Sequence, residues 1–242
     1  MIRRFLGAVQ FLTIIPVRSQ TAVPGQSALF FPVVGAALGI AGGLALDATR
    51  GYLPFALTSI LVLAFWTLIT GGLHDDGFAD VADAVRAWRT PEHIQRILKD
   101  SRIGAHGAIA LILLTLIRWQ ALGSITVPPV PALAACLAIS RTVIVALLWI
   151  TPVAGEGSAL TFSQSLTSTT AILVLCQGVA FAFWPGALAA SWLLGISTLT
   201  VLLARIWFTK RMGGVNGDCL GATSQVAETL CLIVFTCQPC IS

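Results

Sequence analysis

The run PALAACLAISRTVIVALLWIT, residues 131–151, decides the fold class, because so long a stretch carries only one charged residue, Arg141. About 20 apolar residues in a helix cross the hydrocarbon core of a bilayer. Six further apolar runs occur at about 28–48, 54–73, 105–125, 169–184, 186–208 and 226–241. We therefore expect an all-α fold, a polytopic transmembrane helical bundle of about 6–7 spans.

Two of these runs are short. Residues 169–184 and 226–241 fall below the length of a typical span, so tilted, re-entrant and interfacial placements stay open for both. Residues 5–15 form an even shorter apolar stretch, which we expect to lie on the membrane surface rather than to cross it.

The composition agrees with a membrane protein. The chain is 57% hydrophobic and 10% charged, with a mean hydropathy of +0.91, whereas soluble domains carry about 25% charged residues. Its 242 residues leave little room for a separate soluble domain, so we expect one integral membrane domain over 1–242. Nucleic-acid binding needs a basic face on a soluble fold, which the chain lacks. The expected surroundings are a lipid bilayer.

Basic residues predict the orientation. They precede the first run, lie between the second and third, and follow the sixth: Arg3, Arg4, Arg18, Arg86, Arg89, Arg96, Lys99, Arg102, Lys210 and Arg211. With seven spans all of these fall on one side, which the positive-inside rule makes cytoplasmic. We expect a bacterial inner (plasma) membrane protein with a cytoplasmic N-terminus and cytoplasmic catalytic loops at about 74–104, 152–168 and 209–225.

The stretch GGLHDDGFADVADA, residues 71–84, is the strongest chemical signal. In a helix, Asp76, Asp80 and Asp83 share one face. Such hard oxygen ligands suit Mg²⁺ or Mn²⁺. A solvated acidic face is the alternative, disfavoured because Gly, Phe, Ala and Val lie between the aspartates. Asp75 points off this face and is interpreted as a surface charge. His74 is either a ligand or proton-transfer group, or makes a structural hydrogen bond.

Two later stretches add polar groups beside expected helix ends. KDSRIGAHG, residues 99–107, places Lys and Arg before a helix, as in phosphate sites, although such residues can also serve only to set topology. KRMGGVNGDCLGA, residues 210–222, combines glycines that permit close approach of a ligand with Asp218. Arg141 lies within an apolar run. A charged side chain is energetically costly there, so Arg141 is a candidate functional residue.

These motifs resemble those of the cobalamin synthase family, the adenosylcobinamide-GDP ribazoletransferases. Residues 71–84 are similar to GGLHxDGxADxxDA, residues 99–107 to KDSRIGxxG, and residues 213–222 to GGVTGDTLGA. Residues 11–17 (FLTIIPV) and 31–35 (FPVVG) resemble the family's N-terminal pattern, and Glu228 stands where the family also has an acid. Asn216 and Cys219 depart from the family pattern, which usually has Thr at both places.

The resemblance implies a reaction. Adenosylcobinamide-GDP and α-ribazole, or its 5′-phosphate, give adenosylcobalamin, or its phosphate, and GMP. Mg²⁺ is the implied cofactor, and recruitment of other cobalamin-pathway enzymes is a further expectation. The expected catalytic residues are Asp76, Asp80, Asp83, His74 and Asp218, with Asp76, Asp80, Asp83 and Asp218 as metal ligands. The expected substrate-binding residues are Lys99, Asp100, Ser101, Arg102, Gly104, Arg141, Gly213, Gly214, Asn216, Gly217 and Glu228.

Two other function classes share some of these features. A CDP-alcohol phosphotransferase also places aspartates at helical spacing around metals, but its D-x-x-D-G-x-x-A-R pattern is not met here. An ion-coupled transporter holds its ion ligands near the middle of the membrane on broken helices. The acidic residues of this chain cluster at the ends of apolar runs, which disfavours that class.

Overall fold

The computed structural model describes residues 1–17, 23–86, 94, 98 and 102–237. Helices make up this part of the chain, and its one β-type contact is an isolated bridge between Val153 and Val215. The elements are α1 (Ile2–Leu12), α2 (Pro24–Ser27), the 3₁₀ helix η1 (Ala28–Phe30), α3 (Phe31–Thr49), α4 (Phe55–Thr70), α5 (Leu73–Arg86), α7 (Ala105–Gly123), α8 (Pro129–Ile150), α9 (Ser158–Ser165), α10 (Ser168–Ala182), α11 (Ala187–Met212) and α12 (Gly217–Val234). The all-α prediction is confirmed.

Four segments are long and apolar enough to span a membrane: Pro24–Thr49, Ala105–Gly123, Pro129–Ile150 and Ala187–Met212. Two further helix pairs pass only together, α4 with α5, bent by 92°, and α9 with α10, bent by 103°. The described chain therefore holds four spans, or six if each bent pair counts as one. A polytopic bundle is confirmed, at the lower end of the expected number.

The C-terminal part differs from expectation. The short apolar run at 226–241, whose placement the sequence left open, overlaps α12, which begins at Gly217 and is not among the candidate spans. The predicted loop 209–225 is helical except for residues 213–216, because α11 continues to Met212. The apolar pattern places the start of this helix too late in the sequence, because the first half of α12 is polar and only its second half is apolar.

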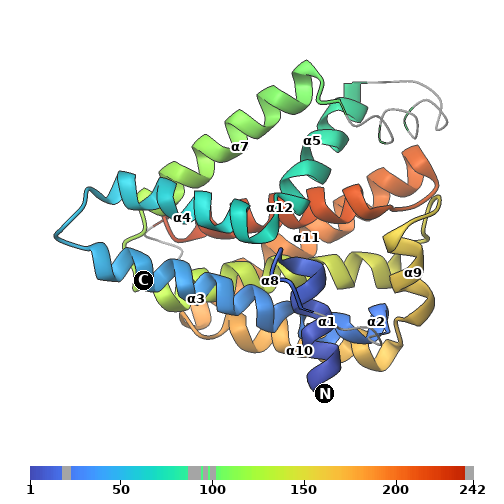
Figure 1. Cartoon of the computed structure of the whole chain (residues 1–242), viewed down its shortest axis with the longest axis horizontal. Coiled ribbons are helices and arrows are strands. Elements are labelled where there is room, and N and C mark those ends of the chain that lie inside the picture. Colours follow the sequence, from blue (N-terminus) through green and yellow to red (C-terminus); the bar gives the residue numbers. More distant parts are fainter. Residues whose placement is uncertain (18–22, 87–93, 95–97, 99–101, 238–242) are drawn as a thin grey trace.

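Helix α8 lies at the centre of the bundle, with α3, α10, α11 and α12 packed against it (Figure 1). Within its apolar window, 83% of the residues are buried inside the protein. A Cβ on Gly35, Gly39 or Gly43 of α3 would lie within 2.5 Å of α8 backbone atoms. Glycine at every fourth residue lets the two backbones approach closely, as in packed membrane helices.

Helices α7 and α11 lie at the outside of the bundle, each with 28% of its window buried. Their exposed side chains are large and apolar, among them Ile112 and Leu116 of α7 and Leu203 and Ile206 of α11. Contiguous exposed apolar faces of this kind need an apolar environment. Because these helices are long and apolar enough to span a membrane, we infer that the exposed faces contact lipid.

A short backbone contact joins two of the predicted loops. The N–H of Val215 donates to the carbonyl of Pro152 at 2.9 Å, and the N–H of Ala154 donates to the carbonyl of Val215 at 2.9 Å. Gly213 ends α11 in the left-handed conformation that turns the chain toward this contact. The start of α12 is thereby held beside the segment that leads into α9.

Candidate active site

Helices α5 and α12 cross at Gly77. A Cβ on Gly77 would lie 2.9 Å from the Cα of Asp218, so only glycine allows the crossing at this distance. Asp76 and Asp80 lie on α5 on either side of Gly77, and Asp218 lies in the first turn of α12. We call Asp76, Asp80 and Asp218 the aspartate cluster. The predicted helix that carries Asp76, Asp80 and Asp83 is confirmed. The crossing brings Asp218 of α12 beside this helix.

The charges of the cluster act on one another. Helix α5 carries four aspartates and turns 92° away from α4, so we place it outside the spanning helices. Burial raises the pKa of Asp80 to about 6, and the charges of Asp76, Asp218 and Asp83 act in the same direction. Burial also raises the pKa of Asp218, against a hydrogen bond from Asn216 that lowers it. A cation would relieve this mutual repulsion.

Asp83 has a different role from the other aspartates of the stripe. Its Oδ2 accepts the backbone N–H of Gly104 at 2.7 Å, and its Oδ1 accepts that of Gly107 at 2.8 Å. A Cβ on either glycine would lie 2.4 Å from this carboxylate. Asp83 therefore holds the N-terminus of α7 with both oxygens, where a negative charge also complements the helix dipole. Gly104, predicted to bind substrate, serves this contact.

Asn216 caps α12. Its Oδ1 accepts the backbone N–H of Cys219 at 3.0 Å, and its Nδ2 donates to Asp218 Oδ2 at 2.9 Å. Asn and Thr are both good N-cap residues, so the departure from the family's usual Thr leaves the cap intact. Gly214 packs on the carbonyl of Pro152, where a Cβ would lie at 2.3 Å. The motif around residues 213–218 thus shapes the helix start that carries Asp218.

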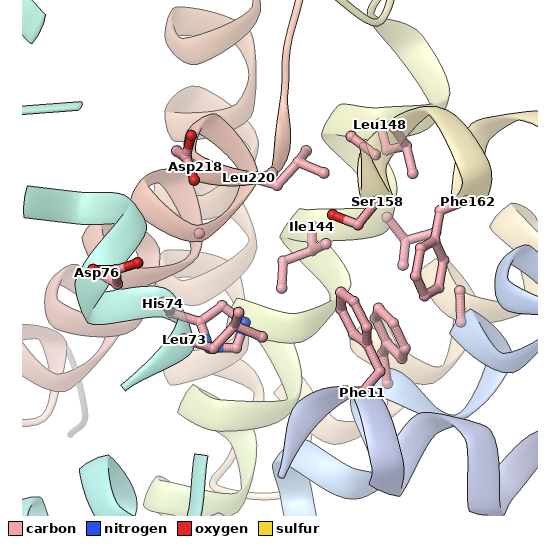
Figure 2. Close-up of a pocket in the computed structure, with 16 residues that line it drawn as sticks. Phe11, Leu73, His74, Asp76, Ile144, Leu148, Ser158, Phe162, Asp218 and Leu220 are labelled. Carbon is pink, nitrogen blue, oxygen red and sulfur yellow. The ribbon is translucent and has the colours of Figure 1, made fainter. Parts of the chain in front are cut away.

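A cavity of about 140 Å³ opens beside the aspartate cluster (Figure 2). Asp76 and Asp218 lie together at one edge, and Phe11 and Phe162 lie at the opposite side. Gly217, at the first position of α12, also lines it. Phe31, Ile144, Val145, Leu148 and Leu220 complete most of the apolar wall.

His74 lines the same cavity and is 3% exposed. Its Nδ1 is buried and has no hydrogen-bond partner among the described residues. Burial lowers the pKa of His74 well below its ordinary value of 6.5, and the charges of Arg141 and Arg118 act in the same direction. The structural hydrogen bond considered from sequence is not seen at Nδ1.

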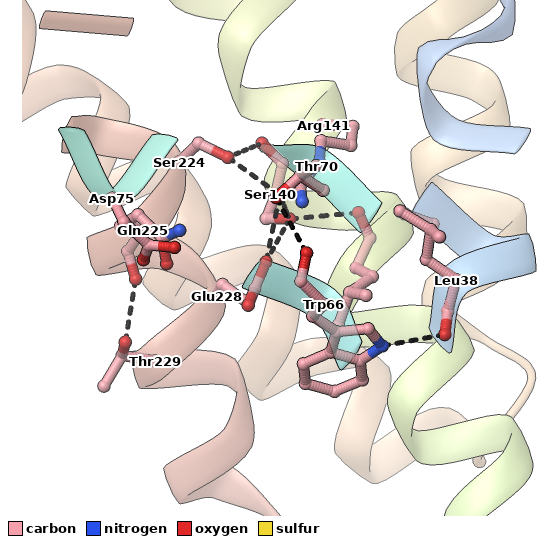
Figure 3. Close-up of polar contacts among 12 residues, drawn as sticks. Leu38, Trp66, Thr70, Asp75, Ser140, Arg141, Ser224, Gln225, Glu228 and Thr229 are labelled. Atoms are coloured by element: carbon pink, nitrogen blue, oxygen red, sulfur yellow. Dashed lines mark hydrogen bonds and ion pairs between the residues drawn. The ribbon is translucent and has the colours of Figure 1, made fainter. Parts of the chain in front are cut away.

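Behind the cavity, a buried ion-pair network joins α7, α8 and α12. Glu228 is 1% exposed and pairs with Arg118 and, at 2.9 Å, with Arg141. Ser140 donates to Glu228 at 3.2 Å, and Ser224 donates to the carbonyl of Ser140 at 3.0 Å (Figure 3). Two arginines around one carboxylate keep Glu228 charged.

This network changes three sequence interpretations. Arg141 and Glu228, predicted to bind substrate, form an ion pair with each other at 2.9 Å and are not among the residues that line the cavity. Asp75, interpreted as a surface charge, lies 3.3 Å from Arg118 and is part of the network, so that interpretation is wrong. Sequence reasoning missed Arg118, although it is a charge within the run 105–125 and the argument used for Arg141 applies to it equally.

Part of the predicted phosphate site cannot be placed. Lys99, Asp100 and Ser101 lie outside the described residues. Arg102 is described and exposed, two residues before the N-cap of α7.

The sequence as a whole matches one protein family. The sequence model of the cobalamin-5-phosphate synthase family matches residues 4–236. The chain belongs to this family. The match covers the aspartates of α5, the α7 N-terminus and the start of α12, so the cobalamin-5-phosphate synthase motifs are the elements that build the site described above.

Individual relatives agree with the family match. An adenosylcobinamide-GDP ribazoletransferase of Geotalea daltonii is 34% identical over 250 residues, covering 96% of each chain. Proteins of the same name from Vibrio parahaemolyticus and Shewanella piezotolerans are 32% and 31% identical, over 93% and 95% of this chain and 89% and 93% of the relatives. No solved structure is significantly similar to the chain.

The donor set of this cobalamin-5-phosphate synthase family member fits Mg²⁺ in one particular way. Among the described residues, no three His, Cys, Asp or Glu side chains are arranged to hold a metal ion by themselves. Mg²⁺ in phosphate-processing sites is bound by one or two carboxylates together with substrate phosphates. The aspartate cluster, in which burial and neighbouring carboxylates raise the pKa of Asp80 and of Asp218, offers that incomplete set. Each oxygen of Asp83 already accepts one backbone N–H, which makes Asp83 a poorer candidate ligand than the aspartate cluster.

Proposed function

We propose that this chain joins adenosylcobinamide-GDP to α-ribazole, or to α-ribazole 5′-phosphate, and releases GMP. The observation that carries the proposal is the family match over residues 4–236, with relatives named for this reaction at 31–34% identity over nearly the whole chain. The product is adenosylcobalamin or its 5′-phosphate. The same match favours this transferase over the CDP-alcohol phosphotransferase and transporter alternatives.

The reaction is a displacement at phosphorus. A ribose hydroxyl oxygen of ribazole attacks the phosphorus that carries cobinamide, the bond from that phosphorus to the GMP oxygen breaks, and the hydroxyl proton is lost. Mg²⁺ bound beside the pyrophosphate would neutralise its charge and stabilise the leaving GMP. One or two carboxylates of the aspartate cluster would hold the ion together with pyrophosphate oxygens, and another carboxylate of the cluster would take the proton.

The remaining predicted residues have other roles. Lys99 and Arg102 are proposed to contact phosphate oxygens, since charge-assisted contacts are the strong ones for such groups. Asp83 positions the α7 N-terminus immediately after this segment. We place the site at the cytoplasmic face of a bacterial inner membrane, because Arg3, Arg4, Lys210 and Arg211 border it in sequence and favour that side.

The test uses the purified full chain in lipid nanodiscs. GMP release is measured with adenosylcobinamide-GDP, with and without α-ribazole, and with and without Mg²⁺. We expect release that requires both substrates and the metal. Release without ribazole would indicate hydrolysis, and no release with all three components present would overturn the proposal. Asp76→Asn and Asp218→Asn should each strongly reduce release at a Mg²⁺ concentration that saturates the native chain, while the protein stays in the membrane fraction.

A further inference from the structure

The cavity beside the aspartate cluster has aromatic walls. Phe11, Phe31 and Phe162 come from α1, α3 and α9, and their ring centroids lie 4.6–5.6 Å apart. Phe11 and Phe31 are nearly parallel, at 3°. With Ile144 and Leu148 of α8, they form the apolar part of the cavity wall. Such walls suit a planar ring, because aromatic faces gain from stacked or edge contacts.

Among the described residues that line the cavity, His74 is the one buried polar side chain. His74 is buried and its Nδ1 has no partner within the described protein. The other polar side chains that line the cavity are Asp76, Ser158 and Asp218, which are at least partly exposed to solvent. A buried polar atom without a partner is unfavourable, so Nδ1 is expected to meet one polar atom of a bound ligand.

We propose that this cavity binds the dimethylbenzimidazole ring of α-ribazole, with His74 Nδ1 donating a hydrogen bond to the free ring nitrogen N3. The inference rests on the proposed function and assigns one substrate to one part of the site. Dimethylbenzimidazole has one free ring nitrogen, since the other carries ribose, and its two methyl groups are apolar. A cavity with one buried polar atom and aromatic walls matches a ligand of this kind.

Neither other part of the substrates fits equally well. Guanine has polar atoms along most of its edge, and a cavity with one buried polar group would leave several of them unpaired. A corrin macrocycle is far larger than about 140 Å³. Sites for whole drug-sized ligands measure about 300–1,000 Å³, so this cavity accommodates one small ring system.

The placement also has a chemical consequence. Asp76 and Asp218 lie at one edge of the cavity (Figure 2), and a ring bound inside would direct its ribose toward that edge. The attacking hydroxyl is then beside the carboxylates proposed to hold the metal and pyrophosphate. In phosphoryl displacement the protein takes little covalent part. Holding the nucleophile beside the phosphorus is therefore a main source of the rate acceleration.

The first experiment fills the cavity. Ala159 of α9 is buried and lines it, so Ala159→Phe is expected to raise KM for α-ribazole at least about tenfold, by removing space for the ring. KM for adenosylcobinamide-GDP should stay within about twofold. Ala146→Phe is the matched control, because Ala146 lines a separate groove on another side of α8. A rise in KM for adenosylcobinamide-GDP instead would overturn the assignment.

The second experiment tests the hydrogen bond and does not depend on Ala159→Phe folding. The α-riboside of 5,6-dimethylindole has the shape of α-ribazole with C–H in place of N3. The native chain should use α-ribazole about 5- to 10-fold better by kcat/KM, the effect of one hydrogen bond. His74→Phe should use the two nucleosides equally. A preference that survives in His74→Phe, or that is absent in the native chain, would refute the His74 contact.

These results separate the two proposals. GMP release by the native chain tests the transferase function alone, whatever the variants do. Equilibrium dialysis of α-ribazole against the full chain in nanodiscs, without the second substrate, tests the cavity alone. We expect binding that Ala159→Phe abolishes and Ala146→Phe retains. Equal binding to both variants would place the ring elsewhere, even if GMP release is normal.

Discussion

The backbone of Gly77 in α5 lies against the backbone of Asp218 in α12, so close that a Cβ on Gly77 would be 2.9 Å from Asp218 Cα. Gly77 and Asp218 are far apart in sequence and belong to different motifs. Their contact is what brings Asp76 of α5 and Asp218, in the first turn of α12, to one edge of the cavity.

Gly77→Ala should therefore separate α5 from α12 and misalign the aspartate cluster. We expect kcat for GMP release to fall by about 100-fold, the usual effect of a displacement of about 1 Å in a catalytic arrangement. Gly195→Ala is the control, because a Cβ on Gly195 meets nothing within 4 Å. Native kcat in Gly77→Ala would show that the close crossing is not needed for the chemistry.

Asp83 and Asp76 should differ in their relation to Mg²⁺. Asp83→Asn loses a charged acceptor for two backbone N–H groups and should cost about 2 kcal/mol of stability, read as a lower melting temperature, with the Mg²⁺ concentration for half-maximal activity unchanged. Asp76→Asn should leave the melting temperature near native and raise that concentration. If Asp83→Asn also shifts the Mg²⁺ requirement, Asp83 is a metal ligand after all.

Removing the charge of Glu228 should destabilise the bundle. Glu228→Gln leaves Arg118 and Arg141 buried with one carboxylate fewer, and loss of one partner from a buried pair costs about 3–5 kcal/mol. Asp47→Asn removes a solvent-exposed pair with Arg50 and should change stability by less than about 1 kcal/mol. Unfolding in nanodiscs or mild detergent, followed by tryptophan fluorescence, measures both. Equal effects would mean that the buried network contributes nothing beyond a surface pair.

The raised pKa of Asp80 predicts how metal and pH act on stability. Folding raises this pKa from 3.8 to about 6, so the folded state binds the proton more tightly. Without metal, this group contributes stability that is full below about pH 4 and is lost as pH rises through about 6. Mg²⁺ can replace the proton, so it should raise the melting temperature more at pH 7.5 than at pH 5.

Asp80→Asn is the control for that measurement. It removes the titrating group and should reduce both the pH dependence and the gain from Mg²⁺. A gain from Mg²⁺ that is equal at the two pH values, in the native chain, would contradict a site in which the ion and the proton compete.

Much of the site could be predicted from spacing alone. Asp76, Asp80 and Asp83 fall on one face of any helix that contains them, and α5 is that helix. Spacing could not show that Asp83 accepts the backbone N–H groups of Gly104 and Gly107, because these hydrogen bonds depend on where α7 begins in space. Lys99 and its neighbours remain predictions, since they lie outside the described residues.

The apolar runs and their few charges were enough to establish membrane residence and an all-α bundle, because solvent preference and helical periodicity are local properties of a chain. The motifs were enough to place it in a family. Only the packing of helices decided which charge meets which: Asp218 with the α5 aspartates, Glu228 with Arg118 and Arg141, and His74 with an aromatic cavity. Partners of this kind come from segments distant in sequence, and only the close approach of glycine-lined helices brings them together.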